Sequence, residues 1–351
     1  MKIGLLTFHD TNNFGSYLQT IGLYKKIVDL GCNCEIIDYQ CESLIKREVP
    51  QPYKFSISPK AIIKDILWGR YLRKKYNNLK TLLKNNAQIS VPYYKDSIAN
   101  SKNLYDAFVV GSDIVWGMDI IEGDTTYFLD FVNDKKKTAF SSSVGNPWKN
   151  EEKSLLKPLL SDFNYIAVRE NESADWVEEL TGKRPNVVCD PTMLLTTSEW
   201  LEYTSGKYEK DKYVLAYFPT AKSLEDAKRY AKMHHLKCWV INHGLPIKGV
   251  TSVKPDCLQD FLALFKNAQF VFTASYHGML FSVYFNRQFA YYNRAHKSRM
   301  NTLASKLSVL DREGTEYDVL KMPEINYLNV NKAVEDYRNY SIDCLKQLLL
   351  V

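Results

Sequence analysis

The fold is decided by the stretch Phe270-Val271-Phe272-Thr273-Ala274-Ser275-Tyr276-His277-Gly278-Met279-Leu280-Phe281-Ser282. Its opening residues form an apolar run of strand length, and the residues after Gly278 are apolar and of helical character. A short polar segment lies between the two, so the chain turns from a strand into a helix. Such strand-turn-helix units build parallel sheets that are covered by helices. The stretch therefore predicts an α/β protein.

The same unit recurs on both sides of this stretch, where short apolar runs alternate with amphipathic segments. We predict strands over residues 2–8, 34–39, 108–111, 137–142, 165–168, 186–189, 213–218, 238–242, 270–273 and 289–292. We predict helices over residues 15–30, 172–181, 223–233, 258–267, 278–285, 298–306 and 331–350. This alternation favours parallel strand pairing. It predicts two Rossmann-like halves that face a cleft, with a C-terminal closing helix.

The length of the chain sets the number of domains. At about 150 residues per domain, 351 residues predict about two. The polar stretch 196–212 separates two series of strands and helices, so we predict domains over residues 1–195 and 196–351. Residues 41–102 interrupt the first series with many Tyr and Lys and a cluster of prolines. We interpret them as a basic helical insertion, which is either a solvated surface or a flap that contacts an acceptor or a membrane.

Composition and charge exclude several classes of protein. The chain has 46 Lys and Arg against 40 Asp and Glu, and this net charge of +6 is too mild for a nucleic-acid-binding stripe. The seven cysteines are scattered, which favours buried free thiols over disulfides and gives no zinc spacing. We expect no signal peptide and no membrane span. We therefore expect a cytoplasmic protein, with a peripheral contact at the inner membrane face left open.

The first candidate site is the turn between the first predicted strand and the first predicted helix. It contains Asn13, Phe14, Gly15 and Ser16. Backbone N–H groups at a helix start can hold an anion or sugar hydroxyls, but the same turn can simply cap the helix. It lacks the G-x-G-x-x-G pattern, which argues against a nicotinamide cofactor. His9 follows the first strand and would line the same cleft.

The second candidate site follows the strand predicted at 108–111, where Ser112 and Asp113 stand at the carboxyl edge of the sheet. Sites of α/β proteins form at this edge. The carboxylate of Asp113 could accept a proton from an acceptor hydroxyl, or it could cap the following turn.

The third candidate site is the junction of the opening stretch, where Ser275 and Tyr276 precede His277 and Gly278. Exposed N–H groups and the helix dipole favour an anion at such a position. A histidine there can donate or accept a proton near neutral pH. The alternative is a histidine that only packs in the core or caps the helix.

Two basic segments complete the candidate set. Arg169 stands at the end of an apolar strand, where its planar guanidinium suits a carboxylate or phosphate, unless it only pairs with Glu170 or Glu172. Lys297 follows the strand predicted at 289–292 by a few residues, and Arg299 is its rival for the same role.

At these residues the chain resembles the polysaccharide pyruvyl transferase family. The resemblance runs in family order from residue 2 to about residue 311. Its pieces are the segments 2–8, 13–19, 110–113 with Trp116, 127–131, 168–170, 190–195, 273–278 and 281–282.

The resemblance implies a fold similar to two-domain GT-B glycosyltransferases, with the acceptor on the N-terminal domain and the donor on the C-terminal one. It implies transfer of a pyruvyl group from phosphoenolpyruvate to a sugar as a ketal, with no metal and no other cofactor. The family's donor-binding arginine, catalytic histidine and downstream lysine fall on Arg169, His277 and Lys297. Ser275 departs from relatives that carry an arginine at this position.

Two other functions remain open from the sequence. A nucleotide-sugar-dependent glycosyltransferase could use Arg169 and Lys297 to bind a diphosphate and His277 on the sugar side. A non-catalytic glycan-binding protein could use the insertion as its contact surface. Fold alone does not decide among the three.

Overall fold

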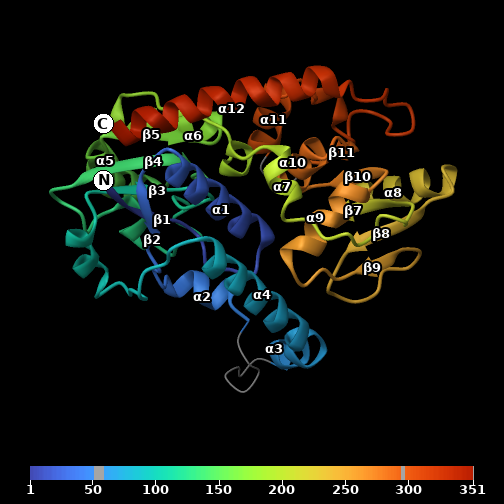
Figure 1. The fold of residues 1–351 in the computed structure, drawn as a ribbon, viewed down its shortest axis with the longest axis horizontal. Helices are drawn as coiled ribbons and strands as arrows, with labels where there is room; N and C mark the ends of the chain where they lie inside the picture. Colours follow the sequence, from blue (N-terminus) through green and yellow to red (C-terminus); the bar gives the residue numbers. More distant parts are fainter. Residues whose placement is uncertain (51–58, 294–296, 351) are drawn as a thin grey trace. The chain divides into compact units, whose positions relative to one another are not determined.

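A computed structural model describes residues 1–50, 59–293 and 297–350 of the chain (Figure 1). The chain divides into two units by its internal contacts. Unit 1 comprises Met1–Gln51, Leu79–Leu195 and Asp336–Val351, and unit 2 comprises Pro52–Asn78 and Thr196–Glu335. One break between the two units lies between Leu195 and Thr196, and the predicted domains 1–195 and 196–351 stay a prediction. Residues 52–78 of the insertion group with unit 2, and residues 336–351 group with unit 1.

Unit 1 is built on a six-stranded sheet in the order β2-β1-β3-β4-β5-β6, and all its strand pairs are parallel. The strands are β1 (Lys2–Leu6), β2 (Asn33–Ile36), β3 (Ala107–Val110), β4 (Lys136–Ser142), β5 (Tyr165–Val168) and β6 (Asn186–Val187). Its helices include α1 (Phe14–Asp29), α2 (Glu42–Glu48), α5 (Asn150–Ser161) and α6 (Asn171–Thr181), with short 3-10 turns η3 (Ile98–Leu104), η4 (Thr125–Phe128) and η5 (Pro191–Leu194).

Helix α1 lies deep in unit 1, with most of its residues buried. Asn13 begins it, because its side chain accepts a hydrogen bond from the N–H of Gly15 at 3.0 Å. A Cβ at Gly22 would lie 2.3 Å from the carbonyl oxygen of Pro191. Glycine therefore permits the close approach of α1 to η5.

Unit 2 is built on a five-stranded parallel sheet in the order β11-β10-β7-β8-β9. The strands are β7 (Tyr213–Tyr217), β8 (Lys237–Ile241), β9 (Thr251–Val253), β10 (Phe270–Thr273) and β11 (Gln288–Tyr291). Its helices are α3 (Pro59–Lys64), the π-helical turn η2 (Asp65–Gly69), α7 (Thr197–Leu201), α8 (Ala221–Met233), α9 (Leu258–Asn267), α10 (Tyr276–Tyr284), α11 (Lys297–Lys306) and the 3-10 turn η6 (Leu310–Arg312).

Two helices contain residues of both units. These are α4 (Arg70–Asn86) and α12 (Tyr327–Leu350), the long red helix of Figure 1. In its unit 1 part, α12 buries Leu345 and Leu348, and Ser341 Oγ accepts a hydrogen bond from the N–H of Cys189 at 2.9 Å. The predicted closing helix is thus confirmed. Among the described residues, no helix is long and apolar enough to cross a bilayer.

Each sheet reverses its strand order once. In unit 1 the chain runs outward from β1 to β2 and returns to pair β3 on the other side of β1, and in unit 2 it does the same with β8, β9 and then β10 around β7. Ligands of α/β proteins bind at the carboxyl ends of the strands at such a reversal. The prediction of two Rossmann-like α/β halves is confirmed. Strand β9 and helix α5 were not predicted.

Candidate functional site

At the reversal of unit 1, two residues that the sequence places in the acceptor set lie together. Ser16, in the first turn of α1, donates a hydrogen bond from Oγ to Asp113 Oδ2 at 2.8 Å. The other carboxylate oxygen of Asp113 accepts from the N–H of Ile114 at 2.9 Å. Asp113 has a φ of 75°, in the left-handed region that few side chains other than Asn and Asp adopt. The half-buried carboxylate is therefore held in one orientation at the carboxyl end of β3.

A glutamine that the sequence reasoning missed fixes the neighbouring backbone. Gln19 is fully buried, and its Nε2 lies 2.9 Å from Ser16 O and 3.0 Å from Thr7 Oγ1. Its Oε1 accepts from the N–H and the hydroxyl of Ser112 at 3.3 and 3.1 Å. One amide thus ties the ends of β1 and β3 to α1. In the sequence, the feature that could have indicated this role is a polar residue among the apolar positions of α1.

The turn that precedes α1 serves as a cap in the structure. The carbonyl oxygen of the Asn13 side chain accepts from the N–H of Gly15, Asn13 itself is exposed, and Phe14 is buried at 3% exposure. This is the capping alternative weighed from the sequence. Contact of the turn with an anion or a sugar stays a prediction.

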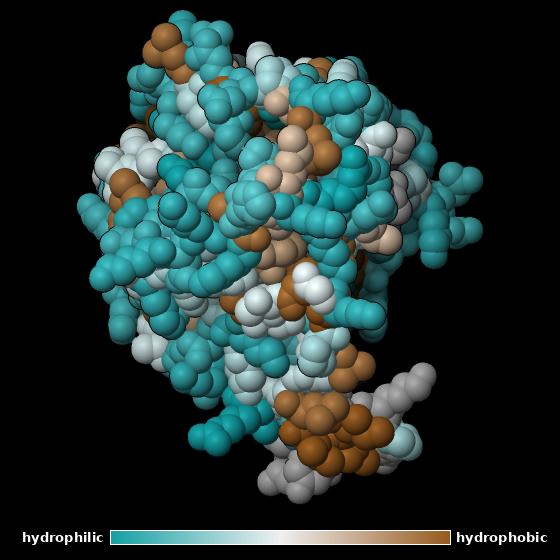
Figure 2. Space-filling view, turned by 90° about the vertical axis from the view of Figure 1, so that its right-hand side faces the viewer, coloured by the Kyte–Doolittle hydropathy of each residue, from teal (hydrophilic) through white to brown (hydrophobic). Residues whose placement is uncertain are grey.

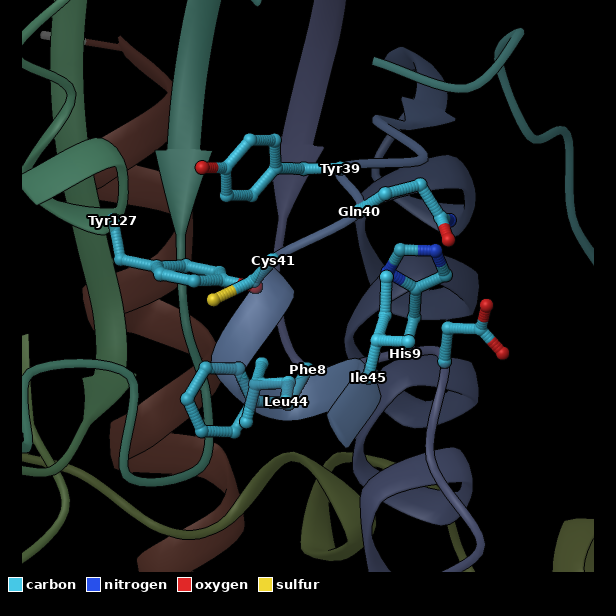
Figure 3. A pocket seen from close by; sticks show the side chains of 9 residues that line it. Phe8, His9, Tyr39, Gln40, Cys41, Leu44, Ile45 and Tyr127 are labelled. Atoms are coloured by element: carbon cyan, nitrogen blue, oxygen red, sulfur yellow. The ribbon is translucent and has the colours of Figure 1, made fainter. Parts of the chain in front are cut away.

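His9 lines a small pocket of unit 1. Rings of Phe8, Tyr39 and Tyr127 lie on one side of the pocket, and His9 and Gln40 lie on the other (Figure 3). The rings of Phe8 and Tyr127 meet edge to face at 5.0 Å. The pocket has a volume of about 10 Å³, so it holds nothing larger than a water-sized group.

The hydrogen bonds of His9 go to Thr7 and Asp38 rather than to Ser16 or Asp113. Nδ1 lies 3.2 Å from Thr7 O, and Nε2 lies 3.0 Å from Asp38 Oδ1. Both oxygens are acceptors, so both hydrogen bonds form at once only on a doubly protonated ring. Burial raises the pKa of Asp38, but the hydrogen bonds from His9 and Gln40 and the charges of His9 and Lys80 together outweigh this and hold that pKa below its ordinary value.

Arg169 is nearly fully buried at 3% exposure, at the carboxyl end of β5. Its Nη1 pairs with Asp190 Oδ2 at 2.7 Å, and its Nε donates to Ser143 Oγ at 2.9 Å. Glu170 lies farther away, with Oε2 at 3.7 Å from Nε. The principal partner is therefore Asp190, which the sequence reasoning did not consider. Direct contact of Arg169 with a donor stays a prediction.

The third candidate site lies at the reversal of unit 2, where α10 begins. Thr273 Oγ1 donates to Tyr217 O and accepts from the N–H of Ser275, both at 3.0 Å. Ser275 caps the helix by accepting from the N–H of Gly278 at 3.3 Å. These bonds hold His277 in the first turn, half-buried, with its ring edge to face with Tyr276 at 5.7 Å. The N-terminal turn of a helix is a favourable position for an anion.

The same sheet edge carries an aromatic residue that the sequence reasoning missed. Phe218 follows β7 directly, is 46% exposed and has a φ of 48°. A left-handed backbone is unusual for a bulky residue and marks a position worth testing for function. Its ring packs on Tyr217, with centroids 4.7 Å apart. In the sequence, the feature that could have drawn attention to Phe218 is an aromatic residue followed by Pro219 at the end of a strand.

The downstream cations lie on α11. Lys297 is its first residue, with a side chain outside the described part of the structure, and Arg299 is half-buried. Arg169 belongs to unit 1, whereas His277, Lys297 and Arg299 belong to unit 2. Within the described ranges, no group of three or more His, Cys, Asp or Glu side chains could hold a metal ion.

No curated protein matches the chain. Similar solved structures include Arabidopsis thaliana UGT89C1 with UDP, at 10% identity and a TM-score of 0.49, covering 99% of this chain and 98% of that one. They also include the UDP-GlcNAc 2-epimerase of Methanocaldococcus jannaschii, at 12% identity and a TM-score of 0.45, covering 97% and 93%. The profile of the family described as polysaccharide pyruvyl transferase matches residues 13–296, which confirms the resemblance, and the chain belongs to this family.

Proposed function

We propose that this protein transfers the pyruvyl group of phosphoenolpyruvate to a sugar of a polysaccharide or glycan precursor, where it forms a cyclic ketal. Membership in the family supports the transfer of pyruvyl groups. The observation that carries the donor assignment is the start of α10, where Ser275 and Thr273 hold His277 in the first helical turn. Phosphoenolpyruvate carries a carboxylate and a phosphate, and N–H groups at a helix start favour such anions.

In the proposed mechanism, His277 acts as general acid. It gives a proton to the methylene carbon of the enol, which becomes a methyl group and leaves an oxocarbenium-like centre at the neighbouring carbon. A sugar hydroxyl adds to that carbon and loses its proton to Asp113. The bond to phosphate then breaks, and inorganic phosphate leaves with the electron pair. A second hydroxyl adds and gives its proton to the neutral imidazole of His277, which closes the ketal and restores the general acid.

The remaining proposed residues bind the substrates, and Arg169, which also belongs to the proposed catalytic set, stabilises the leaving phosphate. Ser275, Tyr276 and Gly278 contribute the helix start, and Lys297 and Arg299 contribute positive charge for the donor. Arg169 stays in the donor set with the orientation of its guanidinium fixed by Asp190 and Ser143. On the acceptor side, the hydrogen bond from Ser16 orients the Asp113 carboxylate toward its role as base. The proposed acceptor set is completed by His9, Asn13, Phe14, Gly15 and Ser112.

Phosphate release from phosphoenolpyruvate in the presence of an acceptor mixture tests the role of His277. We expect His277→Asn to lower the rate of phosphate release by about 100-fold or more, because a general acid typically accelerates a reaction by at least this factor. The matched control is His235→Asn, at an exposed position of unit 2 with a left-handed backbone that asparagine tolerates. Retained activity in His277→Asn would remove histidine from the mechanism.

Two further measurements test the donor and the product. We expect phosphoenolpyruvate to raise the melting temperature more than uridine and guanosine diphosphate sugars do, and mass spectrometry to find acceptor products that carry one pyruvyl ketal. Stabilisation by the nucleotide sugars alone would favour a glycosyltransferase and contradict the proposal. Absence of any ketal product would favour a glycan-binding protein.

A further inference from the structure

Three aliphatic side chains of unit 2 form an exposed surface that the proposed function does not use. Ile63, Ile66 and Leu67 are 56%, 70% and 55% exposed. Their spacing of three and four residues places them on one side of the α3 and η2 segment. Figure 2 shows hydrophobic residues gathered at the lower end of the view, beside the grey atoms. Large apolar side chains that cluster in this way mark an interaction site. We name these three residues the α3–η2 surface.

The charge of the chain is concentrated beside this surface. Residues 59–76 contain six Lys and Arg and one Asp, a net charge of +5, whereas the whole chain carries +6. Arg70 is exposed, and the Lys74 side chain is 65% exposed. Lys75 is buried and lies away from solvent. The exposed apolar face is therefore followed directly in the chain by the exposed cations Arg70 and Lys74.

The segment is anchored to the rest of unit 2. Tyr71 donates a hydrogen bond from its hydroxyl to Pro255 O at 2.8 Å, and Asn78 donates to Asp256 O at 2.9 Å. Lys74 pairs with the Asp256 carboxylate at 2.7 Å. These contacts come from the first half of α4, directly after η2. The α3–η2 surface therefore directly precedes a helix, α4, that is bonded to other residues of unit 2.

We propose that the α3–η2 surface docks on an anionic lipid bilayer. The side chains of Ile63, Ile66 and Leu67 enter the boundary between headgroups and acyl chains, while the exposed cations Arg70 and Lys74 contact lipid phosphates. The charge argues against a second copy of this chain as the occupant, because the segment keeps a positive excess even after Asp256 is set against Lys74, and two copies of it would repel each other. Three aliphatic residues are also far fewer than the roughly 20–30 residues a side of a stable protein interface.

Co-sedimentation with vesicles tests the proposal, and it needs neither donor nor acceptor, so its outcome is independent of the proposed activity. The probes are vesicles of phosphatidylcholine alone and of phosphatidylcholine with phosphatidylglycerol. We expect tighter binding to the anionic vesicles, and weaker binding at about 1 M salt. Ile66→Asp should lower the partition coefficient by about tenfold or more. Arg70→Gln should lower it by about fivefold.

Two matched controls separate docking from general effects of charge and hydrophobicity. Leu245→Asp changes a leucine that is 71% exposed elsewhere in unit 2, and Lys183→Gln removes an exposed charge in unit 1. Both variants should bind the anionic vesicles with the same partition coefficient as the unaltered protein. Equal binding to neutral and anionic vesicles, or equal losses in Ile66→Asp and Leu245→Asp, would overturn the proposal. So would a dimer in light scattering that Ile66→Asp converts to a monomer, because the surface would then be an interface between copies.

Discussion

Replacing Gly278 by alanine should disrupt the start of α10. A Cβ at this position would lie 2.3 Å from Thr273 Oγ1, 2.9 Å from Tyr217 Cδ1 and 3.1 Å from Thr273 Cβ. The Thr273 hydroxyl cannot turn away freely, because it holds hydrogen bonds to Tyr217 O and Ser275 N. The added methyl must therefore break those bonds or push the helix away from β7 and β10.

The size of the effect follows from opposing contributions. Alanine gains about 1 kcal/mol over glycine in a helix. Overpacking costs about 2 kcal/mol, and the loss of the two hydrogen bonds of Thr273 costs about 1 kcal/mol each. The net loss in the free energy of unfolding is then about 3 kcal/mol. Because the same movement displaces His277, we expect phosphate release to fall together with stability.

Urea unfolding followed by tryptophan fluorescence measures this loss, with Gly206→Ala as the control. No atom lies within 4 Å of a Cβ at Gly206, so that variant should be as stable as the unaltered protein. In a Thr273→Ala background the Oγ1 clash is absent, and Gly278→Ala should then cost about 1–2 kcal/mol less. An unchanged unfolding midpoint in Gly278→Ala would refute the steric reasoning, and additive losses in the double variant would refute the assignment to Thr273.

Two further substitutions test the charged pairs of unit 1. Asp190→Asn leaves the buried Arg169 guanidinium without its carboxylate and should cost about 3–5 kcal/mol in urea unfolding, whereas Asp175→Asn, in an exposed ion pair, should cost less than about 1 kcal/mol. Equal losses of stability in Asp190→Asn and Asp175→Asn would contradict a structural role for the buried pair of Arg169 and Asp190. The lowered pKa of Asp38 stabilises the fold above about pH 4, and this contribution is lost as the pH falls through the folded-state value. Melting temperatures below pH 4 should therefore depend less on pH in Asp38→Asn, and an unchanged acid dependence would contradict the lowered pKa of Asp38.

The sequence predicts the central elements well, because their burial leaves a plain apolar pattern. Strands β5 and β10 and helix α9 have the same bounds in the structure as in the prediction. Strand β9 was missed because it has three residues, pairs only with β8 and lies at the sheet edge. Helix α5 was missed because Pro158 and several charged residues obscure the spacing of Leu156 and Leu160.

The candidate site was predictable only in part. The sequence places Ser16 and Asp113 in one acceptor set without predicting their contact, which follows from the parallel pairing of β1 and β3. The partner of Arg169 was not predictable, because the position of Asp190 depends on how the short strand β6 ends beside β5. The grouping of residues 52–78 with unit 2 rests on contacts such as Tyr71 with Pro255, 184 residues apart, which no local pattern reveals.

The division of the chain has a consequence for the order of folding. Unit 1 contains the first residues of this sequence, yet its core includes Leu345 and Leu348 of α12, and Ser341 bonds to the backbone that follows β6. Residues 196–335, which belong to unit 2, lie between these parts. During synthesis, domains fold as their residues emerge from the ribosome. The five strands of unit 2 are therefore all available before unit 1 receives its last helix, so the unit whose synthesis starts first is the last to be completed.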